Sequence, residues 1–544
     1  MTSLTTRRDE SRTLPGVRKE RAASRIAEGL VRARVDEILG RRPAVGLALG
    51  VVRGGRLEFF HGHGVADIGS NIPITEETVF RIGSITKLFT AIAVMQLVEH
   101  GLVDLDAPVN DYLRAYPLVA ADASFRPATL RDLLTHTAGI PDVRQITDLL
   151  HSSFTPSGGR PPQLSVESGQ RLPSLAEYYR DGLRIVVEPG SAFAYSNHGY
   201  ATLGQVVEDV AGIPLERFFR ERIFTPLGMA DSNLVRSERI ASRVATGYAM
   251  GGHGPTAVPD RDWICAGAGG IYSTTRDLAR FVAALLGDGA NEHGRVLESA
   301  TVASMFQPHY RPDRRLPGMG LGFFLAEAGS HRLVLHDGIL PGFNSELLVA
   351  PDDGVGVIGL TNGSSGAFAW LSIELGRLLG DVLGLPEAAP RRDVPHHPEV
   401  WAELCGRYVF PPQISDLRQQ LMIGFGADVL VRGGRLTVRL LTPVPALYRG
   451  LPLVPDDPTD PYVFRLDLSP YGLAPVRVVF GPVVDGRAAR VHTDLGGQPW
   501  SLIRVPSASA RRAWPGAVGG ALGALAVASA VRFVRRRGGQ SMRG

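Results

Sequence analysis

The chain has 544 residues, which exceeds the length of one ordinary folding core and predicts at least two domains. Hydrophobic residues make up 44% and charged residues 21% of the sequence, proportions that are typical of a globular protein and exclude overall disorder. The formal net charge of +4 comes from interspersed acids and bases, without a basic stripe that carries aromatic residues, so nucleic acid is not an expected partner.

The amino-terminal part of the chain predicts a leader, a helix and a hairpin. Residues 1–20 are charged and contain no apolar stretch, so they predict a disordered leader rather than a secretory signal, and we expect the protein in the cytoplasm. Apolar residues at helical spacing predict an amphipathic helix over about residues 20–40. Two β-rich runs on either side of Gly54 and Gly55 predict a hairpin.

The region 21–388 reads as one α+β domain. An almost wholly apolar segment over 88–101 predicts a buried helix that stops at Gly101. A mainly helical part follows, in which the polar, Pro- and Gly-rich stretch 152–174 predicts an exposed loop. Residues 333–362 predict strands and 370–384 a closing helix. Strands at both ends of the domain predict one sheet that both ends build.

The carboxyl-terminal part divides into a linker, a β-rich domain and a tail. Residues 389–398 predict a linker, and the short β-type runs between Gly and Pro turns over 399–507 predict a small barrel or sandwich. Within 511–537, an uncharged run over 513–531 has arginines on both flanks. Its length just reaches a bilayer span, but its Ala and Gly content makes it weakly hydrophobic. A transmembrane helix that would bind the protein to a membrane and a flexible tail both remain open.

A single lysine marks the first candidate for chemistry. Lysine occurs only at Lys19 and Lys87, and all other basic positions apart from histidines hold arginine. Lys87 follows Ser84 by three residues at a helix start, so both side chains share one face. A serine nucleophile needs a proton acceptor, which a buried lysine can supply and an arginine cannot. S-x-x-K alone also fits an N-cap serine with a solvated lysine.

Two further motifs favour a shared site. Tyr195, Ser196 and Asn197 form a Y-S-N triplet before an apolar helix, and His336 and Gly338 stand in the strand-like segment HDG that precedes a turn. Each motif also has a structural explanation, as a core tyrosine, an Asx turn or a surface histidine. Three motifs in this order at wide separations are much less expected by coincidence.

With these motifs the sequence resembles the serine β-lactamase and penicillin-binding-protein superfamily, in particular its class C β-lactamase-like group of D-aminopeptidases and esterases. The matching segments are SITK, YSN and HDG, with LLTHTAGI, EPGSAFAYSN, GAGGIYSTTRDLARF and LPGF as lesser matches, over about residues 25–385. The resemblance implies a β-lactamase/transpeptidase-like fold, with helices on both sides of an antiparallel sheet and an all-helical part. Region 399–507 resembles lipocalin-like accessory domains, which can cover or shape the cleft.

The resemblance also implies roles for the site residues. Ser84 would attack a carbonyl, and Lys87 and Tyr195 would transfer protons. Asn197 would position the substrate amide or the Lys87 amine. The substrate would further contact His336 and Gly338, and the backbone N–H groups of Ser84 and Ile339 would form the oxyanion hole.

The third motif departs from the β-lactamase pattern. His336 stands where β-lactamases usually carry a lysine that holds the substrate carboxylate, so we expect β-lactam hydrolysis to be weak or absent. The expected substrates are esters, small amides and D-amino-acid peptides. The alternative is a sensor or cell-wall-fragment binding module that is acylated without turnover.

No cofactor or metal is expected. His61, His63 and His136 lack acidic ligands at useful spacing. Cys265 and Cys405 are isolated, which favours two small buried hydrophobic residues over a disulfide or a thiol enzyme.

Overall fold

The structure is a computed structural model and describes residues 29–142, 165–386, 393–414, 420, 424–442, 445–469 and 475–506. The predicted leader 1–20 and the segment 511–537 lie outside these residues, as does part of the predicted linker 389–398. In the part of the chain that is described, no helix is both long and apolar enough to cross a membrane.

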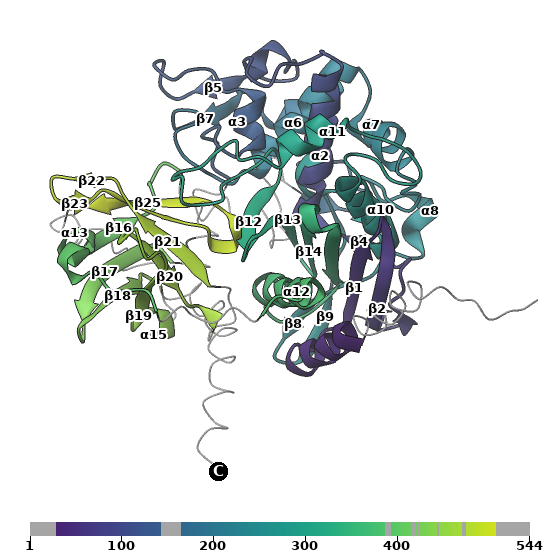
Figure 1. Cartoon of the computed structure of the whole chain (residues 1–544). Coiled ribbons are helices and arrows are strands. Elements are labelled where there is room, and N and C mark those ends of the chain that lie inside the picture. The colour runs from purple at the N-terminus through teal and green to yellow at the C-terminus, as the bar shows by residue number, and fades with distance from the viewer. Residues whose placement is uncertain are drawn as a thin grey trace, which may run out of the picture.

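One antiparallel sheet of seven strands forms the centre of the larger unit (Figure 1). In spatial order its strands are β12 (Phe324–Ala328), β13 (His331–Leu340), β14 (Phe343–Ala350), β15 (Val355–Thr361), β1 (Gly46–Arg53), β2 (Arg56–Asp67) and β3 (Ile72–Pro73). Because β15 pairs with β1, the two sequence ends of the domain meet in the middle of the sheet, and the prediction of one shared sheet is confirmed.

The predicted hairpin is β1–β2. Gly54 and Gly55 both adopt positive φ, of 59° and 74°, which matches the two-residue turns that connect twisted antiparallel strands. Strand β1 is buried along almost its whole length because both faces of the sheet are covered.

Helices cover each face of the sheet, and successive strand residues alternate between two cores. Ala48 and Val52 face a core that contains α2 (Thr86–Glu99) and α10 (Thr275–Leu286). Leu47 and Leu49 face the opposite core, with α12 (Ala367–Leu383) and the helical residues 29–41. Helix α2 is buried along most of its length and ends before Gly101, as the sequence predicts.

The mainly helical part of the domain lies around α2, with α6 (Asn197–Ala211), α7 (Leu215–Phe219) and α9 (Ala266–Gly269) in contact with it (Figure 1). Its other helices are α3 (Leu130–Leu134), α5 (Leu175–Tyr178), α8 (Glu238–Ala241) and α11 (Ser299–Met305). Two-stranded pairs connect them: β4 (Phe80–Arg81) with β11 (Tyr272–Ser273), β5 (Leu118–Ala120) with β7 (Leu183–Ile185), β6 (Ser165–Glu167) with β10 (Arg261–Trp263), and β8 (Gly247–Gly251) with β9 (Gly254–Val258).

The predicted exposed loop over 152–174 needs a correction. Residues 152–164 lie outside the described part, but Ser165–Glu167 form strand β6, and Ser165 and Val166 are buried. The strand pairs with β10, almost a hundred residues further along the chain. A three-residue strand has too few residues to show a period of two, so its partner decides its structure.

The carboxyl-terminal unit is a closed barrel of eight antiparallel strands. The strands are β16 (Gly406–Val409), β17 (Gly426–Arg432), β18 (Arg435–Leu440), β19 (Leu451–Pro455), β20 (Val463–Leu466), β21 (Val476–Phe480), β24 (Arg490–Thr493) and β25 (Trp500–Val505). Two short helices, α13 (Trp401–Leu404) and α15 (Pro445–Tyr448), and the hairpin β22 (Val483–Val484) with β23 (Arg487–Ala488) accompany them. The barrel stands beside the β12 edge of the sheet (Figure 1).

Candidate active site

Ser84 lies in the tight turn η1 (Gly83–Ile85) that leads directly into helix α2. The turn is buried and only Ser84 is partly open to solvent. Gly83 has a positive φ of 52°, and a Cβ atom there would stand 3.0 Å from the backbone nitrogen of Ile339. Glycine therefore allows strand β13 to approach the nucleophile turn closely.

Lys87 is fully buried in the first turn of α2. Its Nζ lies 3.0 Å from Ser84 Oγ, 2.7 Å from Asn197 Oδ1 and 2.8 Å from the carbonyl oxygen of Ala268. The structure thus brings together two predicted site residues around this lysine. Ala268 was not predicted, although it lies within the segment GAGGIYSTTRDLARF.

Asp142 fixes the orientation of the Asn197 amide. The Nδ2 group of Asn197 donates to Asp142 Oδ2 at 2.5 Å, and its backbone N–H donates to Asp142 Oδ1 at 2.6 Å. An ionised carboxylate only accepts hydrogen bonds, so the amide must turn its NH₂ toward Asp142 and its oxygen toward Lys87. Sequence reasoning missed Asp142, because no local pattern connects it with a residue 55 positions away.

Tyr195 covers the lysine from one side. Lys87 Nζ lies 4.8 Å from the centre of the Tyr195 ring, within the range of a cation–π contact. The Tyr195 ring also packs against His136, whose ring centre is 4.5 Å away. The Nδ1 atom of His136 accepts the backbone N–H of Ser196 at 3.0 Å, which holds the Y-S-N segment against the His136 loop. His136 is therefore a further residue of the site that the sequence did not identify.

The His336 side chain is completely buried, unlike the surface histidine of the structural alternative. Its ring stacks on Phe324, with 4.7 Å between the ring centres, and its Nδ1 lies 2.7 Å from the carbonyl oxygen of Asp337. Burial, and then the nearby charge of Lys87, lowers the pKa of His336 to about 3, so the imidazole is neutral at physiological pH. Among the described residues its Nε2 has no hydrogen-bond partner.

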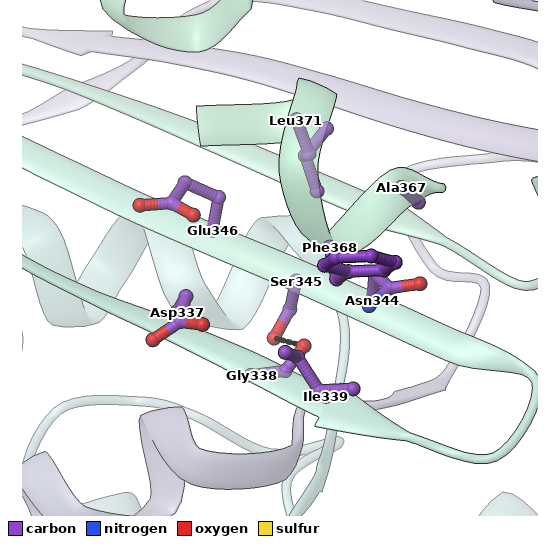
Figure 2. Close-up of a pocket in the computed structure, with 9 residues that line it drawn as sticks. All are labelled: Asp337, Gly338, Ile339, Asn344, Ser345, Glu346, Ala367, Phe368 and Leu371. Carbon is purple, nitrogen blue, oxygen red and sulfur yellow. Dashed lines mark hydrogen bonds between the residues drawn. The ribbon is translucent and has the colours of Figure 1, made fainter. Parts of the chain in front are cut away.

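Strand β13 brings Gly338 and Ile339 against the turn of Ser84. A Cβ atom on Gly338 would collide with the carbonyl oxygen of Ile82 and with Ser345 Oγ. The Ser345 hydroxyl donates to the Ile82 carbonyl oxygen at 2.7 Å, which ties β14 to the nucleophile turn. Figure 2 shows Ser345 beside Gly338. The backbone of β13 can approach this closely only because Gly338 has no side chain.

A pair of carboxyl groups lies beside the same strand segment. Asp337 and Glu346 are directly opposite each other on β13 and β14, and Figure 2 shows both side chains on neighbouring strands. Burial, together with the Asp337 charge, raises the pKa of Glu346 well above its usual range, and burial also raises the pKa of Asp337. Ser372 of α12 donates a hydrogen bond to Glu346. No motif in the sequence indicates this pair.

The geometry supports chemistry by a serine, a lysine and oriented backbone groups. In the part of the chain that is described, no cluster of three or more His, Cys, Asp or Glu side chains could hold a metal ion. The structure places Ser84, Lys87 and Asn197 in direct contact, sets Tyr195 over Lys87, and stacks His336 behind Phe324.

Comparison with known proteins identifies the family. Residues 31–377 match the protein family described as Beta-lactamase. Penicillin-binding protein 4 of Amycolatopsis lactamdurans is 31% identical over 382 residues, which are 66% of this chain and 93% of that protein. Esterase EstB of Burkholderia gladioli is 30% identical over 318 residues, which are 54% of this chain and 77% of the esterase.

Solved structures agree over most of the chain. The crystal structure of SurE aligns with a TM-score of 0.58 at 25% identity and covers 89% of this chain and 100% of SurE. The octameric penicillin-binding protein homologue from Pyrococcus abyssi aligns with a TM-score of 0.54 at 24% identity and covers 88% of this chain and 99% of its own. The chain therefore belongs to the Beta-lactamase family, within the serine β-lactamase and penicillin-binding-protein superfamily, and is a serine hydrolase of that superfamily.

Proposed function

We propose that the protein hydrolyses esters, small amides or D-amino-acid peptides through an acyl-enzyme on Ser84, and that its β-lactamase activity is weak or absent. The observation that carries the proposal is the set of three contacts of Lys87 with Ser84 Oγ, Asn197 Oδ1 and the carbonyl oxygen of Ala268.

These three contacts suit the Lys87 amine in both protonation states. A neutral amine donates its two N–H bonds to the Asn197 and Ala268 oxygens and accepts the Ser84 hydroxyl proton. An ammonium donates to all three oxygens. A group that gains and loses a proton during each turnover needs this adaptability, because neither state then leaves a buried polar group unpaired.

The reaction divides into two steps. Ser84 Oγ attacks the substrate carbonyl carbon and transfers its proton to the Lys87 amine, and the ester C–O or amide C–N bond breaks as the leaving group takes up a proton. Water then attacks the acyl-enzyme, which releases the acid and regenerates the Ser84 hydroxyl. Tyr195 is proposed to assist proton transfer, and the backbone N–H groups of Ser84 and Ile339 to stabilise the oxyanion.

His336 favours substrates without a carboxylate. A buried imidazole with its pKa lowered to about 3 carries no charge at neutral pH, so it offers little electrostatic attraction to an anionic β-lactam. The name of the relative EstB, an esterase, supports the choice of esters as first test substrates.

The experiment compares kcat/KM for a neutral p-nitrophenyl ester and for a chromogenic cephalosporin. We expect kcat/KM for the ester to be at least about 100-fold higher, because a cephalosporin carboxylate without a cationic partner in the site loses roughly 3 kcal/mol of stabilisation. A cephalosporin rate that equals or exceeds the ester rate would contradict the proposal. Stable acylation of Ser84 without turnover of esters, amides or peptides would instead identify a sensor.

A further inference from the structure

One tryptophan of the barrel belongs to the core of the larger unit. Trp500 is the first residue of β25 and is 6% exposed. It packs in the core that contains Phe193, Phe324 and Leu335 rather than in the core of the barrel. The Trp500 and Phe193 rings pack edge to face, with 5.1 Å between the ring centres and 90° between the ring planes. This is a favourable aromatic geometry.

Phe193 connects Trp500 with the proposed proton-transfer residue. It lies two residues before Tyr195 in the segment that leads into α6. Its ring packs edge-on against His136 at 5.8 Å, and His136 in turn lies 4.5 Å from the Tyr195 ring. Trp500 thus supports, through two rings, the side chain that stands over Lys87.

The same barrel connection reaches the other wall of the site. The turn η7 (Leu495–Gly497) joins β24 to β25 and contacts β12. A Cβ atom on Gly497 would stand 3.2 Å from Phe324 Cβ and 3.4 Å from Leu335 Cδ1. Phe324 is the residue on which His336 stacks. The turn η7 and Trp500 at the start of β25 therefore contact residues that lie behind His336 and Tyr195, respectively.

Polar contacts hold the barrel in this position. Arg315 of the larger unit lies 2.9 Å from Asp460 and 3.0 Å from the carbonyl oxygen of Phe480, both in the barrel. Arg477 of the barrel donates to the carbonyl oxygen of Arg315 at 3.3 Å. These three contacts all involve Arg315, and together they hold the barrel against the larger unit beside β12.

We propose that the barrel positions the catalytic residues through its β24–β25 connection, with Trp500 as the positioning residue for Tyr195 and Gly497 as the positioning residue for Phe324 and His336. The inference rests on the proposed function, because it assigns the two residues to the Ser84 reaction. Neither residue touches the reacting atoms, so both act through the aromatic side chains between them and the site.

Two neighbouring glycines provide a matched test. Gly496 and Gly497 both have positive φ, of 65° and 76°, so alanine is strained at either position. The two positions differ in what an added Cβ atom would meet. A Cβ on Gly497 would contact Phe324 and Leu335, whereas a Cβ on Gly496 meets no atom within 4 Å. We expect Gly497→Ala to lower kcat for the p-nitrophenyl ester at least about tenfold, because small displacements of catalytic groups cost this much or more. Gly496→Ala should stay within about twofold of the wild-type value.

Two tryptophans of similar burial provide the second test. Trp401 is 8% exposed and packs in the core of the barrel, away from Phe193. We expect Trp401→Ala and Trp500→Ala both to lower the melting temperature, but only Trp500→Ala to lower kcat, by about tenfold, with little change in KM. Trp500→Phe should restore most of kcat, because a phenyl edge can still meet Phe193.

The second-order rate constant for Ser84 labelling by a fluorophosphonate should fall in parallel with kcat, because both depend on the activated Ser84 hydroxyl. This measurement requires no knowledge of the natural substrate. Equal kcat in the two glycine variants, or equal kcat in Trp401→Ala and Trp500→Ala, would overturn the inference while the hydrolase remains. A wild-type protein that neither labels nor turns over would overturn the proposed function, and the inference with it. If Gly497→Ala does not fold, the tryptophan pair decides.

Discussion

The Asn197 amide acts as a connector between an anion and a cation. Its NH₂ group faces Asp142 and its oxygen faces Lys87, so the direction of the amide depends on the carboxylate. The Asp142 carboxylate thereby sets one of the three contacts of Lys87.

Asp142→Asn tests this connection. An asparagine at 142 can present NH₂ to Asn197, which would allow the Asn197 amide to turn over and present its own NH₂ to Lys87. We expect kcat to fall about 10- to 100-fold, the usual scale for a disturbed proton-transfer group, while the melting temperature changes little. Asp122→Asn is the control, because this exposed carboxylate only caps Ser124. A kcat for Asp142→Asn equal to that of the control would exclude the orienting role.

At this scale the sequence identified residues that stand in recognisable motifs. The i, i+3 spacing predicts that Ser84 and Lys87 share one helix face, and Ser84 Oγ lies 3.0 Å from Lys87 Nζ. It could not identify Asp142 or His136, since their partners come from another part of the chain and only the fold brings them together. The burial of His336 was equally out of reach, because it depends on Phe324 from the neighbouring strand.

The strand pair β13–β14 carries two facing acids next to its catalytic segment, the buried Glu346 and the partly exposed Asp337. Glu346 is 1% exposed and faces Asp337 across the strands. The positive charge of Lys87 in α2 acts on Asp337, whereas Glu374 of the neighbouring α12 is paired with Arg41 and Arg377. With both pKa values raised, the pair retains a proton that the unfolded chain would release.

This proton makes stability depend on pH in a defined direction. Between the unfolded pKa values, at about 4, and the raised folded pKa values, the folded protein binds more protons than the unfolded chain at these two sites, so the free energy of unfolding falls as pH rises through this window. Glu346→Gln removes the ionisable group and keeps its shape. We therefore expect this variant to lose less stability than wild type between pH 5 and pH 8, measured by urea unfolding midpoints.

The control for Glu346→Gln is Glu327→Gln, at a 55% exposed position on β12 of the same sheet. It should follow the wild-type pH dependence. If Glu346→Gln also follows it, Glu346 is not held protonated by its surroundings.

The main strands and helices could be predicted because their periods are long enough to read. The hairpin β1–β2, the buried helix α2 and the strands β13 to β15 all follow the apolar pattern. Short elements such as β6 could not be predicted, because three residues contain no period and pairing with β10 decides their structure. The strands of the carboxyl-terminal unit were recognisable in the sequence. Whether they form a closed barrel or a sandwich depends on the pairing of β16 with β25, which the sequence pattern does not show.

Arg315 links the larger unit and the barrel. It is 23% exposed and contacts Asp313, Asp460 and the Phe480 carbonyl oxygen. No sequence pattern distinguishes it from the many other arginines, since its role depends on how the barrel stands against the sheet.

Arg315→Ala should lower the free energy of unfolding by about 2 kcal/mol, because it leaves two partly buried carboxylates without their cation. Arg332→Ala removes an exposed pair with Asp352 and should cost less than about 1 kcal/mol. Urea denaturation of both variants at one pH and salt concentration gives the comparison. Equal losses would mean that Arg315 contributes no more than a surface arginine.

In the proposed reaction Ser84 carries the acyl group and Lys87 accepts the proton of the Ser84 hydroxyl. The direct measurement is mass spectrometry of the protein quenched during turnover of a p-nitrophenyl ester, followed by assignment of the modified peptide. We expect the acyl group on Ser84 in the wild type and its absence in Ser84→Ala and in folded Lys87→Arg, which keeps the charge but cannot act as the base. Acylation at another residue, or undiminished turnover in Ser84→Ala, would contradict these roles.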